Sequence, residues 1–140
     1  EDNAALLQGL IDGWFDVIAT DHAPHTPFEK NQDFASAPFG ITGLETALPS
    51  LNDRFISKGL LGWDVLVKRY SAEPRRMFKL APVPIVEGGL AEFIVFNPER
   101  FTLFTRDFMK SKSINTPFLD KAVKGLIERV IYRGKELLVR

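Results

Sequence analysis

The stretch "IATDHAPHTPFEK", residues 18–30, decides how the rest of this sequence is interpreted. It contains the only two histidines of the chain, His22 and His25, and places them beside Asp21. The run that leads into it, "WFDVIAT" at residues 14–20, has the Val, Ile and Phe content of a buried β-strand. The sequence therefore predicts a strand that ends where an acid and two imidazoles begin.

Loops at the carboxyl ends of strands carry the catalytic groups of barrel enzymes, so these residues are candidates for chemistry. A carboxylate such as Asp21 can bind a divalent metal or take a proton from a metal-bound water. Pro24 stiffens the turn before His25, whose imidazole could bind metal, bind a substrate carboxylate or do neither. The alternative is that Asp21 caps a turn and that the histidines are only solvated.

The spacing D-H-x-x-H is a poor match to a complete zinc site. Structural zinc takes four protein ligands and catalytic zinc takes three. With two histidines and no cysteine in 140 residues, a catalytic metal would need most of its ligands from elsewhere.

The composition is typical of a globular protein with one core: 45% of the residues are hydrophobic and 26% are charged. Eighteen basic and 18 acidic residues balance, which gives no reason to expect nucleic acid or an anionic membrane as a partner. The absence of cysteine excludes disulfides and a thiol nucleophile and fits a cytoplasmic location. No apolar run approaches the length of a membrane span. The chain begins at Glu1, which is compatible with processing or with a longer parent chain.

The first half of the chain reads as helical segments around a long loop. Apolar spacing predicts a helix over residues 2–12, with Asp2 or Asn3 as its cap and Gly13 as its end. Residues 21–40 contain three prolines and show no period, so they predict a loop. The later expected helices are residues 41–59 with a kink or break at Pro49, residues 63–71, and residues 72–80 with Pro74 near the first turn.

The pattern changes near Ala81, where the Pro- and Gly-rich stretch "APVPIVEGG" connects to short β-type runs. The last two runs, separated by Gly134 and Lys135, predict a hairpin. The expected runs are residues 91–98, 101–105, 126–134 and 136–140.

A single strand flanked by helices cannot form a sheet without neighbouring strands. The organisation therefore favours an α/β fold in which residues 1–80 form the C-terminal end of a larger barrel. Residues 81–140 then form a β-strand appendage.

Several motifs resemble class I dihydroorotase, of the amidohydrolase superfamily. "IATDHAPH", "EK" and "APFGITGLETALP" resemble its last barrel strand and the loop that follows, and "DHAPH" with "APFG" favours it over dihydropyrimidinase and allantoinase. "GGLAEFIVFNPE", "SKSINTPF" and "GLIERVIYRGKEL" are similar to its small β domain. The resemblance covers nearly all 140 residues but only about the C-terminal third of a family member.

The resemblance implies the end of a (β/α)8 barrel with a small β-sandwich appendage. It also implies the interconversion of N-carbamoyl-L-aspartate and L-dihydroorotate in de novo pyrimidine biosynthesis, with one or two zinc ions polarising the amide carbonyl and holding a hydroxide. Asp21 matches the family's metal-binding and proton-shuttling aspartate, and His25 matches its ligand of the substrate carboxylate. Pro38, Phe39 and Gly40 match the segment whose amides meet the pyrimidine ring, and His22 matches a supporting, hydrogen-bonded position.

Much of the family's metal site is not found in this sequence. The H-x-H motif, the carboxylated bridging lysine, two later histidines and the Asn-Pro-Pro-Leu-Arg segment are missing, and Asp120 stands where a glycine is common. Only Asp21 remains of the metal ligands. We therefore expect this polypeptide to be inactive alone and to need the missing N-terminal barrel part.

Other residues have structural interpretations. Glu45 and Thr46 fall where a helix begins, so they favour a structural role over catalysis. Arg75 and Arg76 favour a solvated helix face over an anion site, and residues 115–117 favour a turn that docks the β appendage. The twelve phenylalanines are expected mostly in the core, with some on an apolar face where missing barrel elements pack.

Two other functions stay open. The chain could be a non-catalytic dihydroorotase-like subunit that assembles with aspartate transcarbamoylase, or part of a hydantoinase-type ring hydrolase. Its open strand edges could also pair in a homodimer. The intact "TDHAPH" and "APFG" motifs favour the catalytic interpretation, because a degenerate subunit has no chemical reason to keep both.

Overall fold

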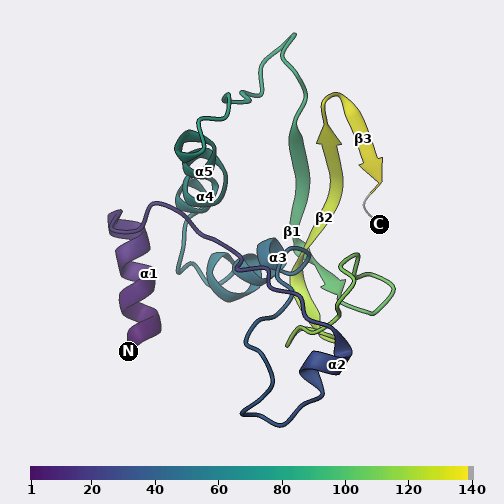
Figure 1. The fold of residues 1–140 in the computed structure, drawn as a ribbon. Helices are drawn as coiled ribbons and strands as arrows, with labels where there is room; N and C mark the ends of the chain where they lie inside the picture. Colours follow the sequence, from purple (N-terminus) through teal and green to yellow (C-terminus); the bar gives the residue numbers. More distant parts are fainter. Residues whose placement is uncertain (139–140) are drawn as a thin grey trace. The chain divides into compact units, whose positions relative to one another are not determined.

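The computed structural model describes residues 1–138, which Figure 1 draws as a ribbon. These residues divide into two compact units. Unit 1 comprises residues 1–19, 54–97 and 127–138, and unit 2 comprises residues 20–53 and 98–126. Within residues 1–138, no helix has the length and hydropathy needed to cross a membrane.

Helix α1 (Asp2–Asp12) confirms the first predicted helix. It ends as expected at Gly13, whose φ of 90° is a left-handed conformation that glycine adopts without a steric cost. The predicted side-chain cap is wrong: Glu1 occupies the N-cap position and makes no capping side-chain bond. Asp2 instead lies in the first turn, where its carboxylate meets the positive end of the helix. No residue of α1 is buried.

The predicted buried strand at residues 14–20 is wrong, because this segment forms no strand. Trp14 is 82% exposed, and the amide of Ile18 donates to the carbonyl of Arg69 at 3.0 Å rather than to another strand. A strand exists only where a neighbour pairs with it, and none of the described strands lies alongside this segment.

The loop at residues 21–40 is confirmed apart from one helical turn, α2 (Pro27–Lys30). Helix α3 (Ala47–Leu51) follows and continues as a π-helical turn, η1 (Asn52–Ile56). The expected kink or break at Pro49 is wrong. Pro49 is the third residue of α3, where an amide hydrogen would have no partner in the helix anyway.

The next predicted pair of helices forms one continuous run. Helix α4 (Trp63–Val67), the π-helical turn η2 (Lys68–Ala72) and α5 (Glu73–Met77) follow one another with helical backbone angles at each junction. The expected separation into two helices is therefore wrong. Pro74 lies in the first turn of α5, as predicted.

The second half of the chain supplies a three-stranded antiparallel sheet, so the described fold is a small α/β structure. The strand order is β1–β2–β3, with β2 in the middle (Figure 1). The strands are β1 (Phe93–Leu103), β2 (Ala122–Tyr132) and β3 (Lys135–Leu138). The first two predicted β runs are thus parts of one strand, and the described residues form one sheet rather than a sandwich.

The predicted hairpin is confirmed, but its turn lies one residue earlier than expected. Tyr132 pairs with Lys135, so the two connecting residues are Arg133 and Gly134. Their φ angles are 50° and 74°. Two successive positive φ values match the twist of the flanking strands, which is why this kind of turn closes two-residue hairpins.

The apolar core of unit 2 is small. Phe104 is fully buried and contacts the ring of Phe108 edge-on, with 5.4 Å between ring centres. Met109 and Val123 complete the buried cluster, and Phe118 packs against it.

A buried polar residue links η1 to both long strands within unit 2. Asn52 is fully buried, and its side-chain amide donates to the carbonyls of Pro98 at 3.0 Å and Lys124 at 2.8 Å. The hydroxyl of Thr102 donates to the carbonyl of Gly125 at 2.6 Å. Buried carbonyls need such donors, since an unsatisfied one costs free energy of folding.

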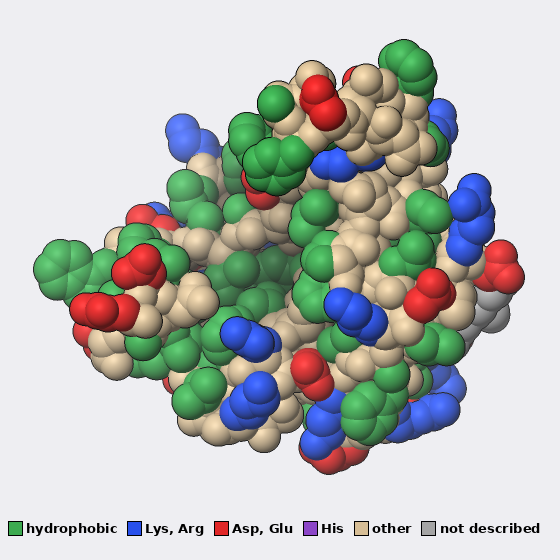
Figure 2. Space-filling model, turned by 90° about the horizontal axis from the view of Figure 1, so that it is seen from below, with side chains coloured by type: hydrophobic (Ala, Val, Ile, Leu, Met, Phe, Trp, Pro, Cys, Tyr) green, Lys and Arg blue, Asp and Glu red, His purple; other side chains and the backbone are tan. Residues whose placement is uncertain are grey.

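Large apolar side chains are exposed in both units. Figure 2 shows hydrophobic side chains at many points of one face, among charged ones. The expectation that the phenylalanines lie mostly in the core is wrong for half of them. The exposed ones are Phe15, Phe28, Phe34, Phe39, Phe78 and Phe101.

Replacing Asn52 tests the polar link in unit 2. We expect Asn52→Ala to lower the free energy of unfolding by about 2 kcal/mol or more, because two buried carbonyls lose their donor. Urea unfolding measures the loss, with the exposed Asn31→Ala as control. Equal unfolding midpoints for the two variants would contradict this role.

Candidate active-site loop

The loop after residue 20 contains a capping box at the start of α2. The amide of Thr26 donates to Glu29 Oε2 at 2.7 Å, and the amide of Glu29 donates to Thr26 Oγ1 at 3.2 Å. The hydrogen bond from the backbone of Thr26 lowers the pKa of the Glu29 carboxyl. This box places Lys30 at the end of α2.

His22 has a structural contact. Its Nδ1 accepts from the amide of Gly43 at 3.1 Å, and its backbone forms a parallel bridge with Ile41. An imidazole nitrogen that accepts a hydrogen bond carries no proton, so the proton of His22 lies on Nε2. This agrees with the predicted supporting role.

His25 contacts the segment 38–40, which the sequence predicts to belong to the same site. Its Nε2 lies 2.9 Å from the carbonyl oxygen of Phe39. A carbonyl can only accept, so this nitrogen carries the proton and donates. On the other side of the ring, Nδ1 lies 3.7 Å from Glu29 Oε2. His25 is thus held between the end of the loop and α2.

All three carbonyls of Pro38, Phe39 and Gly40 accept hydrogen bonds from side chains. Lys30 Nζ donates to Pro38 O at 2.7 Å and to Gly40 O at 3.2 Å. Asn115 Nδ2 also donates to Gly40 O, at 3.1 Å. With the contact from His25, every carbonyl of this segment has a side-chain hydrogen-bond donor.

The amides of the same segment are left available. In a trans peptide the N–H points opposite to the carbonyl of the same plane, and the described chain has no cis bond. The N–H groups of Phe39 and Gly40 therefore point away from Lys30 and His25, and neither has a partner among residues 1–138. The Phe39 ring is 94% exposed. This segment can present two donors and an apolar surface to a ligand.

Asp21 lies at the start of the loop with an exposed side chain and a φ of 45°. Aspartate is among the few residues that adopt this conformation readily. No group of three His, Asp or Glu side chains that could hold a metal ion occurs within the described part of the chain. The described residues therefore do not by themselves supply the three protein ligands of a catalytic zinc site.

The turn expected at residues 115–117 lies later, at residues 117–120, but Asn115 still holds the loop. The carbonyl of Asn115 accepts from the amide and hydroxyl of Thr42, at 2.9 and 3.3 Å. Thr42 is fully buried. Asn115 thus contacts both Gly40 and Thr42 inside unit 2, and its side chain is a site residue that local sequence reasoning missed.

Glu45 has the structural role that its position predicted. Its Oε1 accepts from the amide and hydroxyl of Ser111, both at 2.6 Å, and from the amide of Lys110 at 3.1 Å. Partial burial raises the pKa of the Glu45 carboxyl, but the hydrogen bonds from Ser111 and Lys110 outweigh it, so the pKa lies below the ordinary 4.5.

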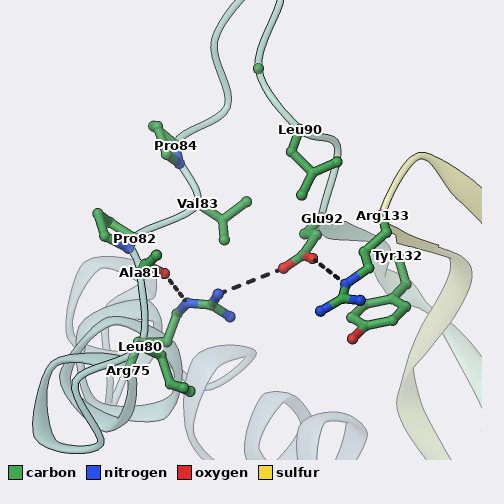
Figure 3. A pocket seen from close by; sticks show the side chains of 11 residues that line it. Arg75, Leu80, Ala81, Pro82, Val83, Pro84, Leu90, Glu92, Tyr132 and Arg133 are labelled. Carbon is green, nitrogen blue, oxygen red and sulfur yellow. Dashed lines mark hydrogen bonds and ion pairs between the residues drawn. The ribbon is translucent and has the colours of Figure 1, made fainter.

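A pocket in unit 1 contains none of the predicted site residues. Figure 3 shows Glu92 between Arg75 and Arg133, with N–O distances of 3.6 and 3.9 Å. Arg75 also donates to the carbonyl of Ala81 at 3.1 Å. The expectation of a merely solvated Arg75 is therefore wrong, whereas Arg76 is exposed and pairs with its helix neighbour Glu73.

No protein-family model matches the chain. Over 135 residues it is 41% identical to the dihydroorotase of Anoxybacillus flavithermus, covering 96% of this chain and 32% of the relative. The chain resembles part of a dihydroorotase. The dihydroorotase of Carboxydothermus hydrogenoformans is 38% identical over the same length, so the chain spans about a third of these dihydroorotases.

Solved structures agree on the fold. The L-hydantoinase (dihydropyrimidinase) of Arthrobacter aurescens matches with a TM-score of 0.83 and 26% identity, over 95% of this chain and 31% of that one. The inactive dihydroorotase-like domain of a Chaetomium thermophilum CAD-like multifunctional protein matches with a TM-score of 0.65 and 20% identity, over 96% and 35%. Sequence identity is therefore higher to the dihydroorotases than to these structures.

Substituting Gly40 tests the close packing of the loop. Its φ is 123°, and an added Cβ would lie 2.8 Å from Ala23 O and 3.2 Å from His25 Nε2. We expect Gly40→Ala to destabilise the protein by more than about 1 kcal/mol. The control is Gly59→Ala, at φ 66° with open space around it, which tests backbone strain alone. Thermal unfolding measures the stability of both variants. Equal losses of stability would contradict the packing argument.

The lowered pKa of Glu45 predicts a pH-dependent stability. A carboxyl whose pKa is lower in the folded state stabilises the fold above its ordinary 4.5 and loses this effect as the pH falls through the folded value. At pH 7 we expect Glu45→Gln to lower the free energy of unfolding by only about 1 kcal/mol, since solvent screens a partly exposed group. Urea unfolding from pH 7 to pH 3 should show this difference shrinking. The exposed Glu87→Gln is the control, and a difference that is constant with pH would be contrary evidence.

Proposed function

We propose that this sequence forms the C-terminal part of a dihydroorotase that interconverts N-carbamoyl-L-aspartate and L-dihydroorotate in de novo pyrimidine biosynthesis. The observation that carries the proposal is the loop in which the carbonyls of residues 38–40 are held and the amides of Phe39 and Gly40 are free. The 38–41% identity to dihydroorotases supports it.

The proposal gives each site residue one role. The amides of Phe39 and Gly40 donate to the ring of the substrate, and the rigid Pro38 precedes them. His25 binds the substrate carboxylate. Because Nε2 of His25 holds Phe39 O, the substrate carboxylate takes the place of Glu29 beside Nδ1, and Nδ1 must carry a proton to donate to it. Asp21 exchanges the proton of the water that is consumed in hydrolysis and released in ring closure.

We infer that the enzyme is zinc-dependent and that most of the zinc ligands lie outside these residues. Asp21 would supply one oxygen ligand, and catalytic zinc takes three protein ligands. Zinc would supply Lewis-acid activation of the amide carbonyl. The described residues alone do not meet this requirement, so we expect residues 1–140 by themselves to be inactive.

The proposed architecture places residues 1–80 at the end of a (β/α)8 barrel and residues 81–140 in a composite β domain, a β-sandwich completed by other strands. The exposed apolar side chains support it, because α1 buries none of its residues and Trp14 is 82% exposed. Burial of such groups against further chain would stabilise the fold.

The first test is hydrolysis of dihydroorotate by the full-length gene product loaded with zinc. We expect Asp21→Ala to lower kcat/KM by at least about 100-fold, since it removes the proton acceptor. The exposed Asp107→Ala is the control and should retain activity. Full activity in Asp21→Ala would refute the assigned role.

The same assay separates the alternatives. An intact protein that binds aspartate transcarbamoylase without hydrolysing dihydroorotate would be a non-catalytic assembly subunit. A protein that hydrolyses hydantoins in preference to dihydroorotate would be a hydantoinase-type enzyme.

A further inference from the structure

Lys30 makes contacts that neither the motif comparison nor the proposed mechanism assigns. It is the last residue of α2, and its side chain reaches back over the loop to two carbonyls, Pro38 O at 2.7 Å and Gly40 O at 3.2 Å. Both contacts are partly buried. The capping box of Thr26 and Glu29 fixes the helical turn that carries Lys30, so the direction of this side chain is set locally.

The positive charge of Lys30 is directed at the backbone. Within residues 1–138 no carboxylate forms an ion pair with Lys30 Nζ. Hydrogen bonds from a charged donor are shorter and stronger than neutral ones. The 2.7 Å bond to Pro38 O is of this kind. Lys30 is therefore a strong constraint on the two ends of the segment 38–40.

This constraint determines where the free amides point. Fixing Pro38 O orients the peptide plane that carries the N–H of Phe39, because the two groups are antiparallel in a trans peptide. His25 does the same for the plane that carries the N–H of Gly40. Asn115 adds a second donor to Gly40 O, so the last carbonyl stays bound when one contact is lost.

We propose that Lys30 is a positioning residue that holds residues 38–40 so that the amides of Phe39 and Gly40 face the substrate. This rests on the proposed function. Lys30 touches neither substrate nor metal in this role; it acts through the backbone. Removing it should loosen binding of the ring more than it slows the chemical step, because Asp21 is not among its contacts.

The experiment compares three variants of the full-length gene product. Lys30→Met keeps the length of the side chain and removes its donors, whereas Lys30→Arg restores a cation with several N–H groups. Lys121→Met is the matched control, because Lys121 is exposed and its side chain makes no described contact. Kinetics with dihydroorotate and hydrogen–deuterium exchange of peptides covering residues 38–43 are measured for each.

We expect Lys30→Met to raise KM about tenfold with a much smaller change in kcat. Lys30→Arg should recover most of the affinity, and Lys121→Met should match the wild type. Exchange at Thr42, whose amide is bonded to Asn115 O, should be faster in Lys30→Met only. Thermal unfolding should separate this effect from a general loss of stability.

Unchanged KM and unchanged exchange in Lys30→Met would overturn the proposal, and so would equal losses in kcat, KM and thermal stability that Lys30→Arg does not relieve. A wild-type protein without activity on dihydroorotate would refute the proposed function instead. The role of Lys30 in catalysis would then be refuted together with the proposed function. The exchange data would still show whether Lys30 holds the loop.

Discussion

The structure of unit 2 depends on side chains that donate hydrogen bonds to backbone carbonyls. Backbone carbonyls taken out of water need donors, and loops cannot supply them through the ladders of helices and sheets. Here the side chain of Asn52 donates to two strand carbonyls. The three carbonyls of residues 38–40 accept from the side chains of Lys30, His25 and Asn115. The apolar core around Phe104 is small, so these polar contacts define the loop geometry.

The same contacts connect the fold to the proposed chemistry. A loop held by its carbonyls presents its amides, and a ligand can use those donors without first ordering the backbone. This is preorganisation: the segment loses its conformational entropy on folding rather than on binding. The proposed metal site differs from the loop, because Asp21 would supply only one ligand and catalytic zinc takes three protein ligands.

Sequence patterns predicted local structure well where the cause was local. Helix α1 and the final hairpin follow from apolar spacing and from a glycine with positive φ. The patterns failed where the outcome depends on distant chain. Residues 14–20 have strand composition, but no described strand pairs with them. The prediction at Pro49 failed for a local reason: helix α3 begins at Ala47, so the proline lies in its first turn and does not interrupt it.

The residue types of the loop can be read from the chain alone: an acid and two histidines after an apolar run, a glycine at residue 40, and motifs similar to those of dihydroorotase. The contacts that these residues make depend on the folded chain. In the folded chain, Nε2 of His25 is bound to Phe39 O, and Asn115, 75 residues from Gly40, donates to the carbonyl of Gly40. Hydrogen bonds between distant residues leave no periodic trace in a sequence, because their geometry exists only after the intervening chain has folded.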